Sequence, residues 1–157
     1  MKTNIFITFL AFLFIISFSV HAQGNKSYNI GDKGPAGGTV FYDKGDNSDG
    51  WQYLEAAPVE FEFTANWNSA VDMVKLLNIN GFTDWRLPDR DELSFMYLNL
   101  KQKGLGDFGT DTYWSSSEEQ KLLTFTIYQN FGNGLVLAAD RLGRGLVSYK
   151  VRAVRQF

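Results

Sequence analysis

The chain has 157 residues, a formal net charge of −2, no cysteine and one histidine. The histidine is His21, which lies in an N-terminal segment that we expect to be removed. Without an imidazole or a thiol, the rest of the chain cannot build a Cys–His or Ser–His catalytic pair, and it lacks the usual nitrogen and sulfur ligands of zinc. The slight excess of acidic residues also argues against a nucleic-acid partner.

The first 22 residues have the layout of a secretory signal peptide. Lys2 supplies a positive start, residues 5–20 are almost wholly apolar, and residues 20–22 (VHA) place compact side chains at a cleavage site. An uncleaved membrane anchor is the alternative, but a spanning helix needs about 20 apolar residues. We therefore expect a signal peptide over 1–22 and a single domain over 23–157, with no membrane span after cleavage. The destination is the periplasm, the cell surface or the medium, and the sequence pattern fixes no oligomeric state.

The next elements in chain order are a hairpin and two helices. Two aromatic-rich runs, residues 39–42 and 51–57, flank a loop of Gly, Asn and Asp, which is a hairpin signal. Apolar residues recur at helical spacing over residues 66–78. A second helix begins after Pro88, where Asp89 can cap the helix and Glu92, three residues later, can bond back.

The remainder of the chain is predicted to form strands. Four runs follow, which cover residues 113–116, 122–128, 135–139 and 146–154, and glycine-bearing turns at residues 132–134 and 143–145 separate the last three. The connections between these runs are too short for parallel crossovers, so we expect antiparallel pairing. The predicted fold class is α+β, with two helices and a twisted antiparallel sheet.

Several motifs occur in an order that resembles the Lcl C-terminal-like family of bacterial surface-protein domains. They are residues 30–38 (IGDKGPAGG), 50–58 (GWQYLEAAP), 81–88 (GFTDWRLP), 113–118 (YWSSSE), 131–134 (FGNG) and 151–155 (VRAVR). The resemblance covers nearly all of residues 23–157. It implies a fold related to the C-type lectins, and it implies glycan or host-surface binding, because the domain that gives the family its name is associated with sulfated polysaccharides.

One group of motif residues is expected to be structural. It comprises Trp85, Arg86, Leu87, Pro88, Asp89, Glu92 and Trp114. The stem of Arg86 lies between apolar neighbours, so we expect its guanidinium to hold a carboxylate or backbone carbonyls.

The charges are unevenly distributed along the chain. Residues 43–62 contain six acidic residues and one lysine, whereas residues 141–157 contain five basic residues and no acidic one. Either the basic end meets a polyanion or the two segments pair with each other. The first alternative makes Arg141, Arg144 and Lys150 candidates for binding sulfate or uronate groups.

Aromatic residues near the late turns could add stacking against sugar rings. The candidates are Tyr128, Phe131 and Tyr149, and packing of the sheet is the alternative role for all three. A separate loop, residues 43–50, offers Asp43, Asp46, Asn47 and Asp49 as oxygen ligands for calcium. That loop lacks the register of an EF-hand, so a solvated hairpin tip is the alternative there. No other cofactor is expected.

These observations favour an exported, non-enzymatic binding module. The expected partner is an extracellular or envelope glycan, with anionic or sulfated polysaccharide as one candidate, or another surface protein. One alternative is a structural or assembly component of the cell envelope without a small ligand. The other is a carbohydrate hydrolase that uses two carboxylates, for which no spacing singles out a pair.

Overall fold

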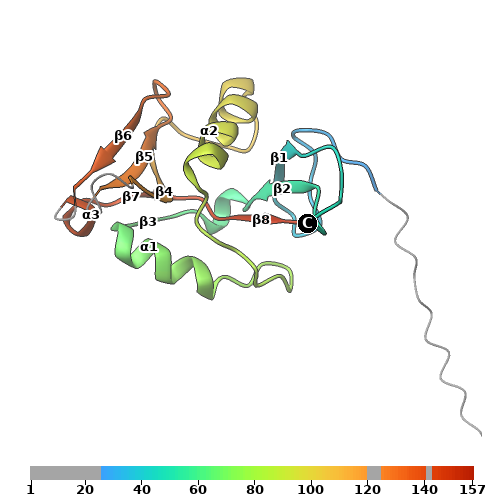
Figure 1. Ribbon diagram of the computed structural model, residues 1–157, viewed down its shortest axis with the longest axis horizontal. Helices are drawn as coiled ribbons and strands as arrows, with labels where there is room; N and C mark the ends of the chain where they lie inside the picture. The colour runs from blue at the N-terminus through green and yellow to red at the C-terminus, as the bar shows by residue number, and fades with distance from the viewer. Residues whose placement is uncertain (1–25, 120–124, 141–142) are drawn as a thin grey trace, which may run out of the picture.

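The computed structural model describes residues 26–119, 125–140 and 143–157 (Figure 1). The described strands form two sheets, one of three strands in the order β1-β2-β8 and one of five strands in the order β3-β7-β4-β5-β6. The predicted signal peptide lies outside the described residues. Within the described part of the chain, no helix is both long enough and apolar enough to cross a membrane.

The three-stranded sheet contains the predicted hairpin. Strands β1 (Thr39–Asp43) and β2 (Tyr53–Ala56) pair antiparallel, with an irregularity between Val40 and Tyr42. Strand β8 (Val154–Gln156) pairs antiparallel with the other side of β2. The last strand of the chain therefore completes a sheet that the first two strands begin.

The five-stranded sheet forms the other end of the molecule. Its strands are β3 (Phe63–Ala65), β7 (Tyr149–Val151), β4 (Thr112–Glu118), β5 (Thr126–Asn130) and β6 (Val136–Ala139). All of its pairs are antiparallel except β4 with β7, which is parallel. The prediction of purely antiparallel pairing is wrong at this point, because β5, β6 and α3 separate β4 from β7 and provide the long connection that a parallel pair needs.

The single strand predicted over residues 146–154 is also wrong. Its first part belongs to a short helix, α3 (Gly143–Leu146), and the rest is divided between β7 and β8 in different sheets. Arg152 and Ala153 lie between these strands. The strand is interrupted there because the Arg152 side chain turns to the carboxylate of Glu62, just before β3. The carbonyl of Ala153 accepts a hydrogen bond from the backbone N–H of Ala57 at 2.8 Å.

Both predicted helices are present. Helix α1 (Trp67–Met73) begins at Asn66, whose side chain accepts from the N–H of Ser69, and a 3₁₀ turn, η2 (Val74–Leu76), extends it. Helix α2 (Arg90–Asn99) begins at Asp89 with both halves of the capping box formed. Two further 3₁₀ turns, η1 (Val59–Phe61) and η3 (Lys101–Lys103), precede β3 and follow α2. The two helices and the mostly antiparallel sheets confirm the α+β class.

The two helices pack on opposite sides of β4, as Figure 1 shows. Side chains alternate across a strand, so Tyr113 and Trp114 of β4 point to opposite faces. Tyr113 packs with α2 residues such as Leu93 and Met96, whereas Trp114 packs with Ala70 of α1. Both β4 side chains are fully buried, which makes this strand the common wall of two hydrophobic cores.

Candidate functional site

A cluster around a buried ion pair joins four of the sequence motifs. Glu55 on β2 is fully buried, and its carboxylate accepts from Arg155 Nη1 at 2.7 Å. The same carboxylate accepts from the backbone N–H groups of Ala36 at 3.2 Å and Gly38 at 2.9 Å. Arg155 also donates from Nε to Asp84 at 2.8 Å. Because every charge has a partner, this cluster stabilises the fold rather than offering a reactive group.

The glycine-rich segment 30–38 owes its composition to this cluster. A Cβ atom at Gly34 would overlap the Glu55 carboxylate, and one at Gly38 would overlap the carbonyl oxygen of Ala56. Glycine is therefore required at both positions so that the loop can approach β2. The segment therefore serves the packing of this loop against β2.

A second buried arginine lies where the chain passes between the sheets. Arg152 is 2% exposed and donates to Glu62 from Nη2 at 2.6 Å and from Nε at 3.0 Å. Glu62 also lies 3.0 Å from Lys150 Nζ and accepts from the Tyr113 hydroxyl at 3.0 Å. Burial, together with the neighbouring Glu62 charge, raises the pKa of the Tyr113 phenol above its ordinary value.

These contacts bear on the two alternatives for the uneven charges. Three of the five basic residues at the end of the chain, Lys150, Arg152 and Arg155, pair with carboxylates of the acidic segment. Of the proposed anion-binding residues, Arg141 lies outside the described part, as does the side chain of Arg144. Lys150 is paired with Glu62. The described part of the chain therefore shows no unpaired cation among the three residues that were predicted to bind a polyanion.

The Trp-Arg-Leu-Pro turn has a structural geometry. Arg86 donates to Glu92 in a bidentate pair, with both nitrogen–oxygen distances at 2.6 Å, and this hydrogen bonding to Glu92 raises the pKa of Arg86. Glu92 in turn accepts from the N–H of Asp89 at the start of α2. The remaining members of the group, Trp85, Leu87, Pro88 and Trp114, are buried. The turn thus fixes the position of α2.

The predicted aromatic ligand residues pack the sheets. Phe131 is 1% exposed and lies between Tyr97 and Tyr113, with ring centroids 5.4 and 4.4 Å away. Its ligand contact stays a prediction, and packing of the ring between α2 and β4 is the role that these contacts support. Tyr128 and Tyr149 are half-buried and contact each other at 4.9 Å beside Trp114. Their neighbours are those of a packed sheet.

The predicted calcium loop uses its carboxylates locally. Asp43 accepts from the N–H of Gly45 at 2.7 Å, Asp46 accepts from the N–H of Ser48 at 2.8 Å, and Asp49 pairs with Lys44 at 2.7 Å. Across the described residues, no three acidic, histidine or cysteine side chains gather closely enough to hold a metal ion. Such local bonding is typical of a hairpin tip.

One surface hollow lies beside both ends of the described chain. It has a volume of about 550 Å³ and combines aromatic with polar side chains. Its lining residues are Lys26, Tyr28, Pro35, Asn47, Gly50, Gln52, Tyr53, Phe82, Arg155 and Phe157. We call this the aromatic hollow. In Figure 1 the first described residues and the C-terminus lie side by side next to β2, which brings these distant segments together.

Ring contacts and hydrogen bonds order the aromatic hollow. Tyr28 meets Tyr53 at 5.3 Å and Phe157 at 5.2 Å in edge contacts, and the Arg155 guanidinium lies 4.2 Å from the centre of the Phe82 ring. The Tyr53 hydroxyl accepts from the side-chain amide of Gln52 at 3.1 Å. Sequence reasoning missed this site because its residues come from four separate segments and form no local pattern.

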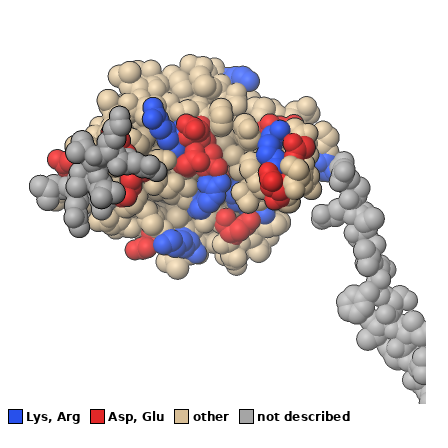
Figure 2. Space-filling view, in the orientation of Figure 1, with Lys and Arg blue, Asp and Glu red and all other residues tan. Residues whose placement is uncertain are grey.

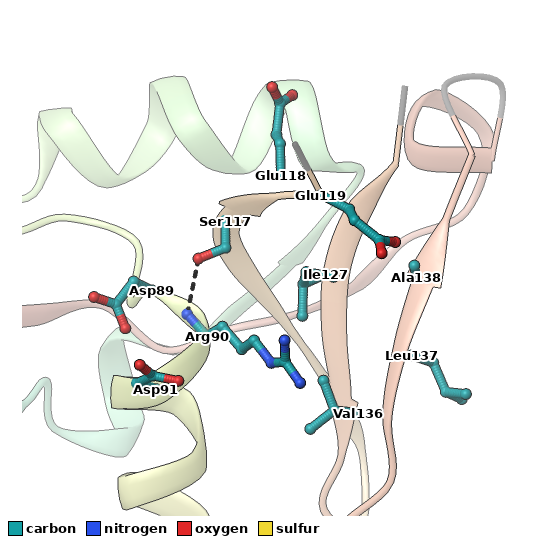
Figure 3. A pocket seen from close by; sticks show the side chains of 10 residues that line it. All are labelled: Asp89, Arg90, Asp91, Ser117, Glu118, Glu119, Ile127, Val136, Leu137 and Ala138. Carbon is teal, nitrogen blue, oxygen red and sulfur yellow. Dashed lines mark hydrogen bonds between the residues drawn. The ribbon is translucent and has the colours of Figure 1, made fainter. Parts of the chain in front are cut away.

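A second hollow separates the start of α2 from the β5–β6 hairpin (Figure 3). It has a volume of about 570 Å³, and we call it the acidic groove. Its lining residues are Asp89, Arg90, Asp91, Ser117, Glu118, Glu119, Ile127, Val136, Leu137 and Ala138. Four of these residues are acidic and one is basic, so the acidic groove disfavours anions. On the face in Figure 2, Lys and Arg lie beside Asp and Glu, and no broad area carries one sign.

The paired charges and the layered helices define an α+β domain whose buried arginines tie the end of the chain to its first strands. The chain belongs to the Lcl C-terminal domain family, whose model matches residues 45–155. The comparison with curated proteins gives no match. The matched region contains the whole acidic groove, whereas the aromatic hollow also draws on Lys26, Tyr28 and Pro35 before that region and on Phe157 after it.

Proposed function

We propose that the protein is an exported, non-enzymatic binding module that recognises a glycan at the aromatic hollow. The observation that carries the proposal is the combination, in one hollow, of half-buried aromatic side chains with amide, hydroxyl and cationic groups. Its volume of about 550 Å³ lies within the range of about 300–1,000 Å³ that is usual for small-ligand sites.

A sugar ring suits this chemistry. One face of a pyranose is covered by C–H groups that pack on an aromatic ring, and its edge carries hydroxyls that donate and accept hydrogen bonds. Tyr28, Phe82 and Phe157 offer aromatic surface, while the amides of Asn47 and Gln52 can exchange hydrogen bonds with hydroxyls. Lys26 lines the same hollow and favours a glycan with an acidic or sulfated substituent, whereas the charge of Arg155 is already paired with Glu55 and Asp84.

Two further arguments support the proposal. The signal-peptide pattern of residues 1–22 predicts a place outside the cytoplasm, where glycans are abundant. The family resemblance implies a C-type-lectin-like fold and an association with sulfated polysaccharides. Neither argument identifies the sugar, whose identity depends on the side chains that line the hollow.

The test is binding of the purified chain to neutral and sulfated glycans, followed by titration of the best ligand at two salt concentrations. We expect Tyr28→Ala and Phe82→Ala each to weaken binding by about tenfold or more, because each removes an aromatic surface from the hollow. Phe95→Ala is the matched control, since Phe95 is a half-buried ring on α2 that stacks on Tyr42 outside the hollow. The control is expected to keep the wild-type affinity.

The outcomes separate the three functional hypotheses. Equal loss of affinity in all three variants would contradict the assignment of the site, because it would reflect a general loss of folding. Absence of binding to any glycan would favour an envelope component without a small ligand. New reducing ends in the incubated polysaccharide would indicate a hydrolase.

A further inference from the structure

Nothing in the described part of the chain bonds to the free edge of strand β6, whereas the outer strands β1 and β8 of the three-stranded sheet are covered. Strand β6 pairs with β5 on one side and ends the five-stranded sheet on the other. The edge of β1 is covered by residues 31–32, which exchange hydrogen bonds with Val40 at 2.8 and 2.9 Å. The edge of β8 is covered by Arg86, which exchanges two with Val154. An open edge is a template for another strand.

The register shows which backbone groups face the open edge. The N–H of Asn130 donates to the carbonyl of Leu135 at 2.9 Å, and Tyr128 lies opposite Leu137. Residues of an antiparallel ladder alternate between facing the partner strand and facing away from it. Leu135 and Leu137 therefore face β5, and Val136 and Ala138 direct their N–H and C=O groups outward.

The two faces of β6 differ in chemistry. The side chain of Val136 points into the acidic groove, and Ala138 lines it, whereas Leu137 points away (Figure 3). Leu135 lies two positions before Leu137, so the two leucines share the face opposite the groove. They are 56% and 45% exposed, respectively. A strand added here would meet apolar side chains on one face and the acidic groove on the other.

The charge of the groove indicates the complementary side chains. Among the described residues that line the groove, Asp89, Asp91, Glu118 and Glu119 are acidic and Arg90 is basic. The Glu119 carboxylate points toward Ala138 of β6, the strand with the open edge (Figure 3). A basic side chain entering from that edge would be attracted to the groove, and an acidic one would be repelled.

We propose that β6 accepts an extended segment of a partner polypeptide as an additional strand, with Lys or Arg at alternate positions facing the acidic groove and apolar residues between them. Main-chain hydrogen bonds to Val136 and Ala138 supply the attachment. The groove and Leu137 select the alternation of basic and apolar side chains. This surface is separate from the aromatic hollow, so the two proposals fail independently.

The probe is a synthetic heptapeptide of alternating Lys and Val with blocked ends, compared with the corresponding Glu and Val peptide. We expect only the lysine peptide to bind, more tightly at low salt. On binding, the amide protons of Val136 and Ala138 become protected from exchange, whereas that of Leu137, which already faces β5, changes little.

Ala138→Pro tests the backbone contact. Proline removes an outward N–H without removing a β5–β6 hydrogen bond, so the fold tolerates it at an edge. Affinity for the lysine peptide is expected to fall by about tenfold or more. Glu119→Gln is expected to weaken binding several-fold and to reduce its salt dependence, whereas Glu60→Gln, an exposed acid on η1, is the matched control without effect.

Three results would overturn the proposal. They are equal binding of both peptides, unchanged affinity of Ala138→Pro, and concentration-dependent dimerisation that protects the same amides without peptide. The last result would make a second copy of the chain the partner. If Ala138→Pro fails to fold, the exchange pattern of the wild-type protein decides, because protection confined to Val136 and Ala138 supports the added strand and its absence contradicts it.

Discussion

Arg152 and Arg155 come from one short motif, yet their guanidinium groups serve different parts of the molecule. Arg155 bonds to Glu55 in the three-stranded sheet and lines the aromatic hollow. Arg152 bonds to Glu62 near the five-stranded sheet and to the carbonyl oxygens of Ala57 and Gly106 at 3.2 and 2.9 Å. The first site opens toward a candidate ligand, and the second is enclosed.

A residue with a structural role can also border a candidate ligand site. Both arginines have fixed carboxylate partners, but only Arg155 also contacts the ring of Phe82, which lines the hollow. Substituting Arg155 would therefore alter folding and binding together. For that reason the glycan test changes Tyr28 and Phe82 and leaves the buried ion pair intact.

The Arg155 and Arg152 sites should differ most in the free energy of unfolding that is lost when the carboxylate of each site, Glu55 or Glu62, is removed. Glu55→Gln leaves the buried Arg155 charge without its Glu55 partner and places a donor amide among donors, which we expect to cost about 3–5 kcal/mol of the free energy of unfolding. Glu62→Gln should cost less, about 1–3 kcal/mol, because Lys150 can turn to solvent and Arg152 keeps its carbonyl acceptors. Urea unfolding followed by tryptophan fluorescence measures both losses.

The exposed Glu60 provides the control for both substitutions. Glu60→Gln is expected to change the free energy of unfolding by no more than about 0.5 kcal/mol. Equal losses for Glu55→Gln and Glu62→Gln would show that the two arginine sites are energetically alike. A larger loss for Glu62→Gln would reverse the comparison.

Local patterns in the sequence were sufficient for much of the fold. Asp89 and Glu92 predicted the start of α2, and the Gly- and Asp-rich loop between β1 and β2 predicted their hairpin, because both signals are local. The α+β class followed from these elements and the late strands. Such features depend on contacts between residues close in sequence.

Other features depend on partners that the sequence does not place. Residues 146–154 alternate like one strand, but the pairing of Arg152 with Glu62, 90 positions earlier, divides that run between two sheets. Phe131 begins the turn after β5, where the sequence predicts contact with a ligand, yet its environment is set by Tyr97 and Tyr113. The aromatic hollow was not predicted, because Tyr28, Phe82 and Phe157 are far apart in the sequence and come together only in the folded chain.

Alkaline pH should lower the free energy of unfolding through the enclosed Arg152 site and not through the open Arg155 site. The raised pKa of Tyr113 means that the unfolded chain releases the phenol proton first, near the ordinary value of 10.0. The free energy of unfolding therefore falls as the pH rises above that value. Tyr113→Phe should remove this part of the decline, while costing about 1 kcal/mol at neutral pH through the lost hydrogen bond to Glu62.

Urea unfolding at about pH 8 and about pH 11 measures the effect on either side of the ordinary phenol pKa. Tyr42→Phe, at a half-buried position on β1, is the control and should keep the wild-type decline. A parallel decline in wild type and Tyr113→Phe would show that another group causes the alkaline loss. At the open site the Glu55 carboxylate accepts from Arg155 and from the N–H groups of Ala36 and Gly38, whereas Glu62 at the enclosed site accepts from the Tyr113 phenol.

Acid pH should reveal the smallest difference, at the solvent-facing side of the Arg155 site. Burial opposes ionisation of Asp84, but the hydrogen bond and charge of Arg155 outweigh it and lower the pKa of Asp84 below its ordinary value of 3.8. Its contribution to stability is therefore complete above that value and disappears as the pH falls through the lowered one. The Asp84 side chain is 54% exposed, so Asp84→Asn should cost less than about 1 kcal/mol at neutral pH. Unfolding titrations of both proteins should converge at the acidic end of the range. A difference that persists there would show that Asp84 stabilises the hollow through shape rather than through its charge on Arg155.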